Sequence, residues 1–345
     1  MKLYQSNGYA NMADMISSET PFILVIGGRG TGKTYNSIYH LLENHIPFIY
    51  LRRTAAEMEL AGKTEFSPIV KVGEDMGIHL MCDNLSKYVY GVFHCDEDGK
   101  RTGEAVAYSM ALSTIASCRS FDASKIEVVL FDEAICENHQ KRMRNENLSI
   151  LNMYESLNRN REMQGKPALK LVCLCNANNM EAPVLDALGC IRALDEMRKK
   201  GQNYKIISAR GLSIFLLNNS PISAEKRQTA LYKLARCQDE FNDMALENSF
   251  SKDNYTDIQV RPLNEYVPYA AIGSICVYRH KSTYDWYISE TISGKPVMFE
   301  NTITDRQRFR MFCIRSWEDY FGRKMLFENV NAKVFYKAVM METMK

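Results

Sequence analysis

The segment from Gly27 to Thr34 constrains the fold of this chain more than any other part of the sequence. It reads Gly-Gly-Arg-Gly-Thr-Gly-Lys-Thr and matches the pattern G-x-x-x-x-G-K-[ST]. The apolar run Pro21–Ile26 before it predicts a buried strand, and residues 33–44 after it predict a helix. A phosphate-binding loop joins a strand to a helix in this order. The sequence therefore predicts an α/β domain built on a P-loop, and a glycine-rich turn without a ligand is the alternative.

Each part of this loop has a chemical role in binding a nucleotide. Glycines let backbone N–H groups turn toward phosphate oxygens, and the next helix presents its N-terminal dipole to the same anion. Lys33 is expected to reach the β- and γ-phosphates, and the Thr34 hydroxyl to ligate Mg²⁺. ATP and Mg²⁺ are thus the expected cofactors. The expected nucleotide-binding residues are Gly27, Gly28, Arg29, Gly30, Thr31, Gly32, Lys33, Thr34 and Asp132.

A second apolar run, Ile126–Phe131, predicts a strand that ends in the acid pair Asp132-Glu133. Asp132 is expected to hold Mg²⁺ through water. Glu133 is expected to orient and polarise the attacking water, which would make the site hydrolytic. Alone, such a pair is more often a solvated turn. The P-loop upstream favours the catalytic interpretation.

Polar residues follow two further predicted strands. Asn176 comes after Leu169–Cys175, where it would contact the γ-phosphate or the lytic water, or simply cap the turn. The pair Arg52-Arg53 comes after Pro47–Leu51 and would bind nucleotide or DNA, or be solvated.

P-loop hydrolases usually also need a cation at the γ-phosphate, which a neighbouring subunit often supplies. The candidates are Arg119, Arg159 and Arg161, although a single arginine is by default a solvated surface charge.

Composition excludes several other classes. The 345 residues are 46% hydrophobic and 24% charged, as in ordinary globular proteins. No apolar run has the length of a membrane span, and the N-terminus lacks a signal-peptide pattern. Ten cysteines without a C-x-x-C pair predict reduced thiols, so the protein is expected to stay inside the cell that makes it. The net charge of +2 does not identify a nucleic-acid binder.

The pattern along the chain predicts three parts. Residues 1–217 alternate strand and helix, with an antiparallel insertion over 80–108 and a last strand at Leu212–Leu217. Residues 218–254 read as a helical linker, with helices over 223–248, and residues 255–345 as a smaller α+β domain. The strands expected in that domain are Ala271–Arg279, Tyr284–Glu290 and Val297–Asn301, followed by a helix from Asn331. A helix is also expected over 138–164.

The C-terminal domain carries a basic run, Arg306-x-Arg308-x-Arg310. If extended, it would place three guanidinium groups on one face, where they would suit phosphates or an acidic partner. A solvated edge strand is the alternative.

The order and spacing of these motifs resemble the DNA-encapsidation ATPases of small phi-29-like podophages. The resemblance covers roughly residues 1–250, and residues 255–345 share only position and strand pattern with that family. It rests on five segments: Ile26–Thr34, Tyr50–Arg53, Leu130–Glu133, Arg159–Glu162 and Cys173–Ala177.

The resemblance implies a P-loop fold of the ASCE, RecA-like kind, a mostly parallel sheet with helices on both faces. It implies a homomeric ring, expected to be pentameric, that docks on the portal of an empty prohead and threads double-stranded DNA inward in the cytoplasm of the infected bacterium. A structural RNA is a further candidate partner. Arg159 becomes the first choice for the trans-acting arginine, and Arg119 the second.

The family's C-terminal domain resembles a degenerate RNase H-type nuclease. Here Asp285, Glu290, Glu300 and Asp305 form no clear metal-binding pattern. The domain is therefore expected to bind DNA or the portal without nuclease activity.

Three other functions remain open at this level. The first is a P-loop helicase or recombinase acting on single-stranded DNA, in which aromatic residues near the basic run would stack on bases. These aromatics are Phe309, Phe312, Trp317, Tyr320 and Phe321, and their spacing favours a core role. The second is a terminase-like packaging nuclease. The third is a capsid-assembly scaffold with a vestigial nucleotide site, against which Glu133 argues.

Overall fold

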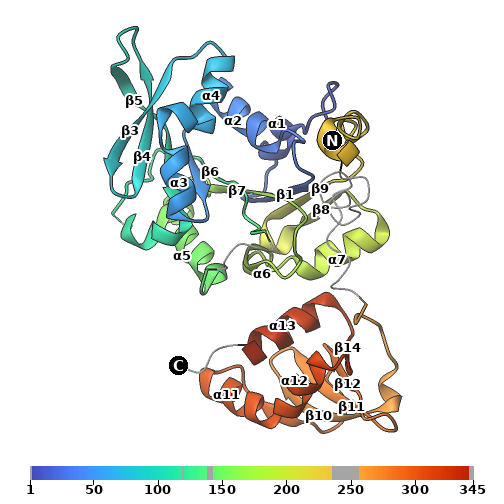
Figure 1. Ribbon diagram of the computed structural model, residues 1–345. Coiled ribbons are helices and arrows are strands. Elements are labelled where there is room, and N and C mark those ends of the chain that lie inside the picture. Colours follow the sequence, from blue (N-terminus) through green and yellow to red (C-terminus); the bar gives the residue numbers. More distant parts are fainter. Residues whose placement is uncertain (1, 119, 138–142, 235–255, 342–345) are drawn as a thin grey trace. The chain divides into compact units, whose positions relative to one another are not determined.

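The computed structural model describes residues 2–118, 120–137, 143–234 and 256–341 (Figure 1). The chain divides into two compact units, residues 1–189 with 197–251, and residues 190–196 with 252–345. Each unit is described by itself below. No helix among the described residues is long and apolar enough to cross a membrane.

In the described part of the chain, the first unit is built on a nine-stranded sheet. Its strands are β1 (Phe22–Gly27), β2 (Phe48–Arg52), β3 (Leu80–Ser86), β4 (Val89–Cys95), β5 (Arg101–Ala111), β6 (Val128–Phe131), β7 (Lys170–Cys175), β8 (Tyr204–Ile207) and β9 (Leu212–Leu217). They lie in the order β3-β4-β5-β2-β6-β7-β1-β9-β8. The strands from β5 to β9 in this order are parallel, while β3, β4 and β8 are antiparallel to their neighbours. The predicted mostly parallel α/β sheet is thus confirmed.

Helices cover both faces of this sheet. They include α1 (Met12–Ile16), α2 (Lys33–Glu43), α3 (Ala55–Ala61), α4 (Pro68–Asp75), α5 (Glu146–Asn158) and α6 (Pro183–Ala187). Figure 1 shows α1, α2 and α4 over one face and α5 and α6 over the other. Alternate side chains of β1 point to opposite faces of the sheet. Ile23 and Val25 belong to the core under α2, while Leu24 and Ile26 are fully buried on the other face.

The predicted antiparallel insertion is present as β3, β4 and β5. The tight turn between β4 and β5 contains Gly99 with a φ of 74°, and the Asp96 carboxylate accepts hydrogen bonds from the N–H groups of Asp98 and Lys100. The long strand β5 then pairs with β2 in parallel, so the insertion extends the main sheet.

The second unit contains a five-stranded sheet in the order β13-β10-β11-β12-β14. Its elements are β10 (Tyr266–Ile272), β11 (Ile275–His280), β12 (Trp286–Ser289), β13 (Val297–Phe299), β14 (Met325–Phe327), α11 (Ile303–Phe312), α12 (Ile314–Phe321) and α13 (Val330–Met341). The core includes sheet residues such as Ile288 and helix residues such as Phe309 and Tyr336. The smaller second domain with strands and helices is thus confirmed.

Several expected elements differ from the structure. The strand expected over Ala271–Arg279 is two strands, β10 and β11, because Gly273 adopts a φ of 54° and the chain turns back. The helix expected over 138–164 is shorter: it forms α5 and a 3₁₀ turn, η3 (Glu162–Gln164), and residues 138–142 lie outside the described residues. The strands β8 and β14 were not predicted. Of the expected linker, α8 (Ser223–Lys226) and α9 (Ala230–Leu234) are helical, and residues 235–254 lie outside the described part.

The expectation that Arg306, Arg308 and Arg310 share one face of an extended segment is wrong. These residues belong to α11, which begins where the Thr302 hydroxyl accepts a hydrogen bond from the Asp305 N–H at 3.2 Å. Because an α-helix has about 3.6 residues per turn, Arg306 and Arg310 lie on one side and Arg308 projects from another.

Candidate nucleotide-binding and hydrolysis site

The P-loop lies between the carboxyl end of β1 and the first turn of α2. Gly30 and Gly32 adopt φ values of 62° and 82°, a backbone conformation that disfavours side chains. The Thr31 hydroxyl donates to the Gly28 carbonyl at 3.0 Å and closes the loop from inside. Thr31 is nearly fully buried, so its side chain shapes the loop.

Lys33 lies inside the loop with its amine held by oxygen atoms. Its Nζ donates to the carbonyls of Gly27 and Gly28 at 2.7 and 2.8 Å and to Oδ1 of Asn176 at 3.1 Å. Burial lowers the pKa of Lys33 to about 8, although the charge of Asp132 acts in the opposite direction. A buried cation whose contacts are neutral oxygens is well placed to receive a phosphate.

Asp132 connects three elements at the carboxyl edge of the sheet. Its Oδ1 accepts a hydrogen bond from Thr34 Oγ1 at 2.9 Å, and its Oδ2 accepts one from the Tyr50 hydroxyl at 2.8 Å. Burial raises the pKa of Tyr50 well above its usual value, and Asp132 adds to the effect, so Tyr50 remains a donor. The hydroxyl and carboxylate oxygens of Thr34 and Asp132 are the ligand type that Mg²⁺ prefers. These two residues therefore fit the expected metal.

Glu133 follows Asp132 in a conformation that is rare for its type, with a φ of 51°. Its side chain is half exposed and forms an ion pair with Nη2 of Arg52. Arg52 also lies 3.5 Å from Oδ2 of Asp132. The first arginine of the Arg52-Arg53 pair thus contacts both acids of the site.

Arg53 has a different environment. Its guanidinium donates to both carboxylate oxygens of Glu146, at 2.8 and 2.9 Å, and both side chains are almost fully buried. This bidentate pair joins the end of β2 to the first residue of α5. The alternative that Arg52 and Arg53 form a solvated pair is therefore wrong, because Arg52 contacts Asp132 and Glu133 and Arg53 lies in the interior.

The P-loop, the acid pair Asp132-Glu133 and Asn176 line one pocket of about 420 Å³ at the carboxyl edge of the sheet. The pocket brings together predicted site residues from three strands, in agreement with the general location of ligands in open α/β sheets. Arg29 lies at its rim, where it forms an ion pair with Glu137. The residues that line it are Arg29, Gly30, Thr31, Gly32, Lys33, Thr34, Tyr35, Asp132, Glu133, Glu137, Leu174, Cys175 and Asn176.

The predicted trans-acting arginines lie elsewhere. Arg159 follows α5, has a φ of 50°, and donates from Nη2 to the Phe121 carbonyl at 3.0 Å. The helix α5 begins near the carboxyl edge of the sheet, where β6 ends, and runs back toward the amino edge, where β7 begins. Arg159 follows α5 and therefore lies at the amino edge. Arg161 lies there too, where it donates to the carbonyl of Ala123. The two edges of a strand of four to six residues are about 15 Å apart. Arg119 lies outside the described residues.

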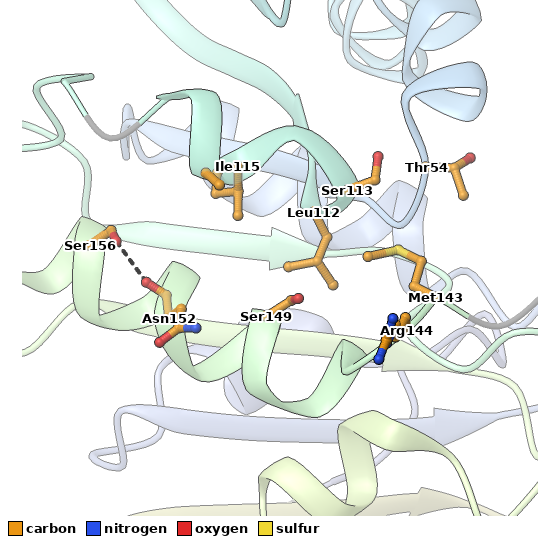
Figure 2. Close-up of a pocket in the computed structure, with 10 residues that line it drawn as sticks. Thr54, Leu112, Ser113, Ile115, Met143, Arg144, Ser149, Asn152 and Ser156 are labelled. Carbon is orange, nitrogen blue, oxygen red and sulfur yellow. Dashed lines mark hydrogen bonds between the residues drawn. The ribbon is translucent and has the colours of Figure 1, made fainter. Parts of the chain in front are cut away.

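A second pocket of about 540 Å³ lies between α5 and the 3₁₀ segment η2 (Leu112–Cys118) (Figure 2). Hydroxyl and amide side chains such as Ser149 and Asn152 line it, together with Arg144, and the described residues of the lining include no carboxylate. Of these two pockets, the P-loop pocket is the one whose described lining includes acidic residues, Asp132, Glu133 and Glu137. Sequence reasoning did not select Arg144, because nothing in its neighbours separates it from other surface arginines.

In the second unit, the basic residues of α11 have local partners. Arg306 Nε donates to Asn301 at 2.7 Å, and Arg308 pairs with Asp305 at 3.2 Å. Arg310 donates to the Val339 carbonyl at 3.1 Å and ties α11 to α13. Among the described residues, no group of three or more His, Cys, Asp or Glu side chains is arranged to hold a metal ion.

Comparison with known proteins agrees with this geometry. The fold is similar to that of the Phi-28 gp11 DNA packaging motor, with a TM-score of 0.66 and 17% identity over 99% of this chain and 100% of that chain. It is also similar to a chain of the bacteriophage Phi-29 viral genome packaging motor assembly, with a TM-score of 0.63 and 18% identity over 97% of this chain and 98% of that one. At these identities the likeness establishes the fold.

No curated protein sequence matches the chain. A family model, however, matches residues 4–339, nearly the whole chain, and it describes the Podovirus DNA encapsidation protein (Gp16). This chain therefore belongs to the Podovirus DNA encapsidation protein family.

Proposed function

We infer that this DNA-packaging protein is an ATP-driven motor that hydrolyses ATP at the P-loop pocket and moves double-stranded DNA into a preformed prohead. The observation that carries this proposal is the set of contacts around Asp132. The Asp132 carboxylate contacts the P-loop threonine Thr34, and the next residue, Glu133, lines the same pocket. A site that only bound nucleotide would not require a second acid beside the first.

The roles of the residues follow from their positions. Lys33 and the P-loop N–H groups would bind the phosphates of the triphosphate, while Thr34 and, through water, Asp132 would hold Mg²⁺, which would neutralise charge that develops on the phosphates. Glu133 accepts the proton of the attacking water. Asn176 contacts the Lys33 amine, so its amide is placed to respond when the γ-phosphate leaves.

Arg159 is proposed to complete the site of a neighbouring copy. It lies at the amino edge of the sheet, about 15 Å or more from the P-loop pocket of its own chain. It is therefore too far away to contact a γ-phosphate bound in that pocket. This supports a head-to-tail arrangement, in which such contacts close into a ring. Five subunits, the phage portal and prohead, and a structural RNA are the expected assembly partners, in the cytoplasm of the infected bacterium.

The C-terminal unit is proposed to be a binding module for DNA or portal without nuclease activity. Arg306 and Arg308 are its candidates for phosphate contacts, since Arg310 has a structural bond to α13. A motor must move along any sequence, so the contacts should be with phosphates, and affinity should fall steeply with salt. Replacing Arg308 with Ala should lower the slope of log affinity against log salt by about one for a lost phosphate contact.

The experiment that tests the proposal is ATP hydrolysis by the full chain without DNA, with duplex DNA and with single-stranded DNA, across a salt series. Lys33→Ala serves as the control. Stimulation by duplex DNA that is lost at high salt and in the control is expected. Stimulation by single strands alone would favour a helicase or recombinase, and metal-dependent cleavage of plasmid DNA would favour a packaging nuclease. If turnover is absent, the same assay with portal-bearing proheads decides whether assembly is required.

A further inference from the structure

The first helix after the last strand of the ATPase sheet contacts the P-loop. Lys226, the last residue of α8, donates a hydrogen bond from Nζ to the carbonyl of Arg29. A Cβ atom placed on Gly30 would lie 2.9 Å from the same Nζ. The Lys226 amine also lies 5.9 Å from the centre of the Tyr232 ring in α9. Thus one lysine connects the segment after β9 with the middle of the phosphate-binding loop.

The contact determines how one peptide group of the loop is oriented. In a trans peptide the C=O and the following N–H point in opposite directions. When Lys226 holds the carbonyl of Arg29, the N–H of Gly30 must therefore point away from Lys226. Gly30 has a φ of 62°, and glycine offers little resistance to rotation of its peptide group. The contact with Lys226 therefore restricts the rotation of this peptide group.

The charges around Lys226 point to an anionic ligand. Among the described residues, no carboxylate pairs with its amine, and burial lowers its pKa. Its charge also acts against that of Lys33, whose pKa it lowers. Two ammonium groups thus approach the same loop, and the hydrogen bonds described for both are with neutral oxygen atoms. The triphosphate of a nucleotide would bring additional negative charge close to both amines.

We propose that Lys226 is a positioning residue of the ATP site, which orients the Arg29-Gly30 peptide for phosphate binding and links nucleotide occupancy to the docking of α8. The inference rests on the proposed binding of ATP at the P-loop. Since coupling between two sites is reciprocal, a nucleotide that binds better when α8 is docked must also stabilise α8 in its docked position. The segment after β9 therefore takes part in the ATP site.

The test compares full-length protein with Lys226→Met, which keeps the length of the side chain and removes its charge and donor. The matched control is Lys233→Met in α9, whose side chain is exposed and outside the site. The first readout is the dissociation constant of a non-hydrolysable ATP analogue with Mg²⁺. Lys226→Met should weaken it about tenfold, the effect expected for a hydrogen bond to a charged group. Lys233→Met should not change it, and Lys226→Arg, which keeps charge and donors, should restore most of the affinity.

The second readout is hydrogen exchange of residues 222–234 with and without the analogue. In the wild-type protein the analogue should slow exchange there, and in Lys226→Met it should not. Unchanged affinity in Lys226→Met, or equal protection of the segment in both proteins, would overturn the proposal. If Lys226→Met does not fold, absence of protection in the wild-type protein would overturn it equally. Failure of the wild-type protein to bind the analogue more tightly than Lys33→Ala would instead contradict the proposed ATPase.

Discussion

Glu133 has two features that belong together. Its backbone adopts a φ of 51°, and its carboxylate is paired with Arg52. A non-glycine residue keeps such a conformation only where its surroundings impose it, and such residues concentrate at functional sites. The Glu133 N–H donates to Oδ1 of Asp132 at 3.1 Å, which stabilises this turn. The strand β6 thus ends in a bend that directs Glu133 into the pocket.

Replacing Glu133 with Gln should abolish most ATP turnover and leave ATP binding intact. The amide keeps the size of the side chain but cannot accept the proton of the attacking water, and loss of a general base lowers rates by about 10²- to 10⁴-fold. Turnover and the dissociation constant of ATP would be measured on the same preparation. Turnover close to the wild-type rate would show that another group is the base.

The affinity for ATP should depend on pH because of Lys33. Burial lowers the pKa of its amine to about 8 in the free protein, and bound phosphates must raise it. Affinity should therefore be full below about pH 8 and fall above it, by up to about tenfold for each pH unit, until the pKa of the complex is reached. Titration calorimetry in two buffers should detect proton uptake on binding near pH 8. Affinity that stays constant across this range would contradict the assignment.

At the scale of elements, the ion pair of Arg53 and Glu146 joins β2 to α5 in the interior. The first residue of α5 is held by this pair, and its N-cap Asn145 makes no capping hydrogen bond through its side chain. Arg159 follows the last residue of the same helix. The orientation of the proposed trans-acting arginine therefore depends on a buried contact at the other end of its helix, and on the carbonyl of Phe121 beside it.

Replacing Arg53 with Met should destabilise the protein by about 3–5 kcal/mol, because it leaves the Glu146 carboxylate buried without its partner. The double variant Arg53→Met with Glu146→Leu should recover part of this loss, since neither charge then remains. Unfolding by denaturant would measure both. Lys71→Met, which removes an exposed pair with Glu74, serves as the control and should change stability little. A loss as small as that of the control would mean that water reaches Glu146.

How much was predictable also differs by element. The strands β1, β2, β6, β7 and β9 were predicted because central parallel strands are short apolar runs with turn residues after them. The edge strand β8 was missed because it is short and none of its side chains is fully buried, so it lacks an apolar run. Gly273 was not recognised as the turn between β10 and β11. The basic run of α11 was considered only in an extended conformation, although Thr302 and Asp305 form a helix start.

The residues of the candidate site also divide into those that the sequence predicted and those that it did not. Lys33, Thr34, Asp132, Glu133 and Asn176 were predictable because fixed spacing and strand ends place them together. The contact of Arg52 with Asp132 and Glu133 was not predicted, and Tyr50 and Lys226 were given no role, because these contacts join segments far apart in the sequence. Lys226 lies 197 positions from the carbonyl that it contacts. Such pairings depend on the order of strands in the sheet, which a single sequence does not specify.

At the scale of the whole molecule, the position of Arg159 makes a prediction about subunits in combination. The variant Lys33→Ala lacks a working P-loop but keeps Arg159, while Arg159→Ala keeps the P-loop and lacks the arginine. Each should be inactive alone under the conditions in which wild-type protein hydrolyses ATP. If Arg159 acts on a neighbouring copy, rings that contain both variants should regain turnover, because an intact P-loop can then face an intact arginine. The measurement is the ATPase rate against the mixing ratio at constant total protein.

The matched control replaces Arg159→Ala with Arg161→Ala in the same mixtures. Arg161 donates to the carbonyl of Ala123 in its own chain, so its loss should act within each subunit and mixing with Lys33→Ala should restore nothing. Recovery with Arg159→Ala alone would establish a contribution across the subunit boundary. Mixtures that remain as inactive as their components would instead confine Arg159 to its own chain. Because that chain places it at the opposite edge of the sheet from the P-loop, its role would then be to anchor the end of α5 beside β6.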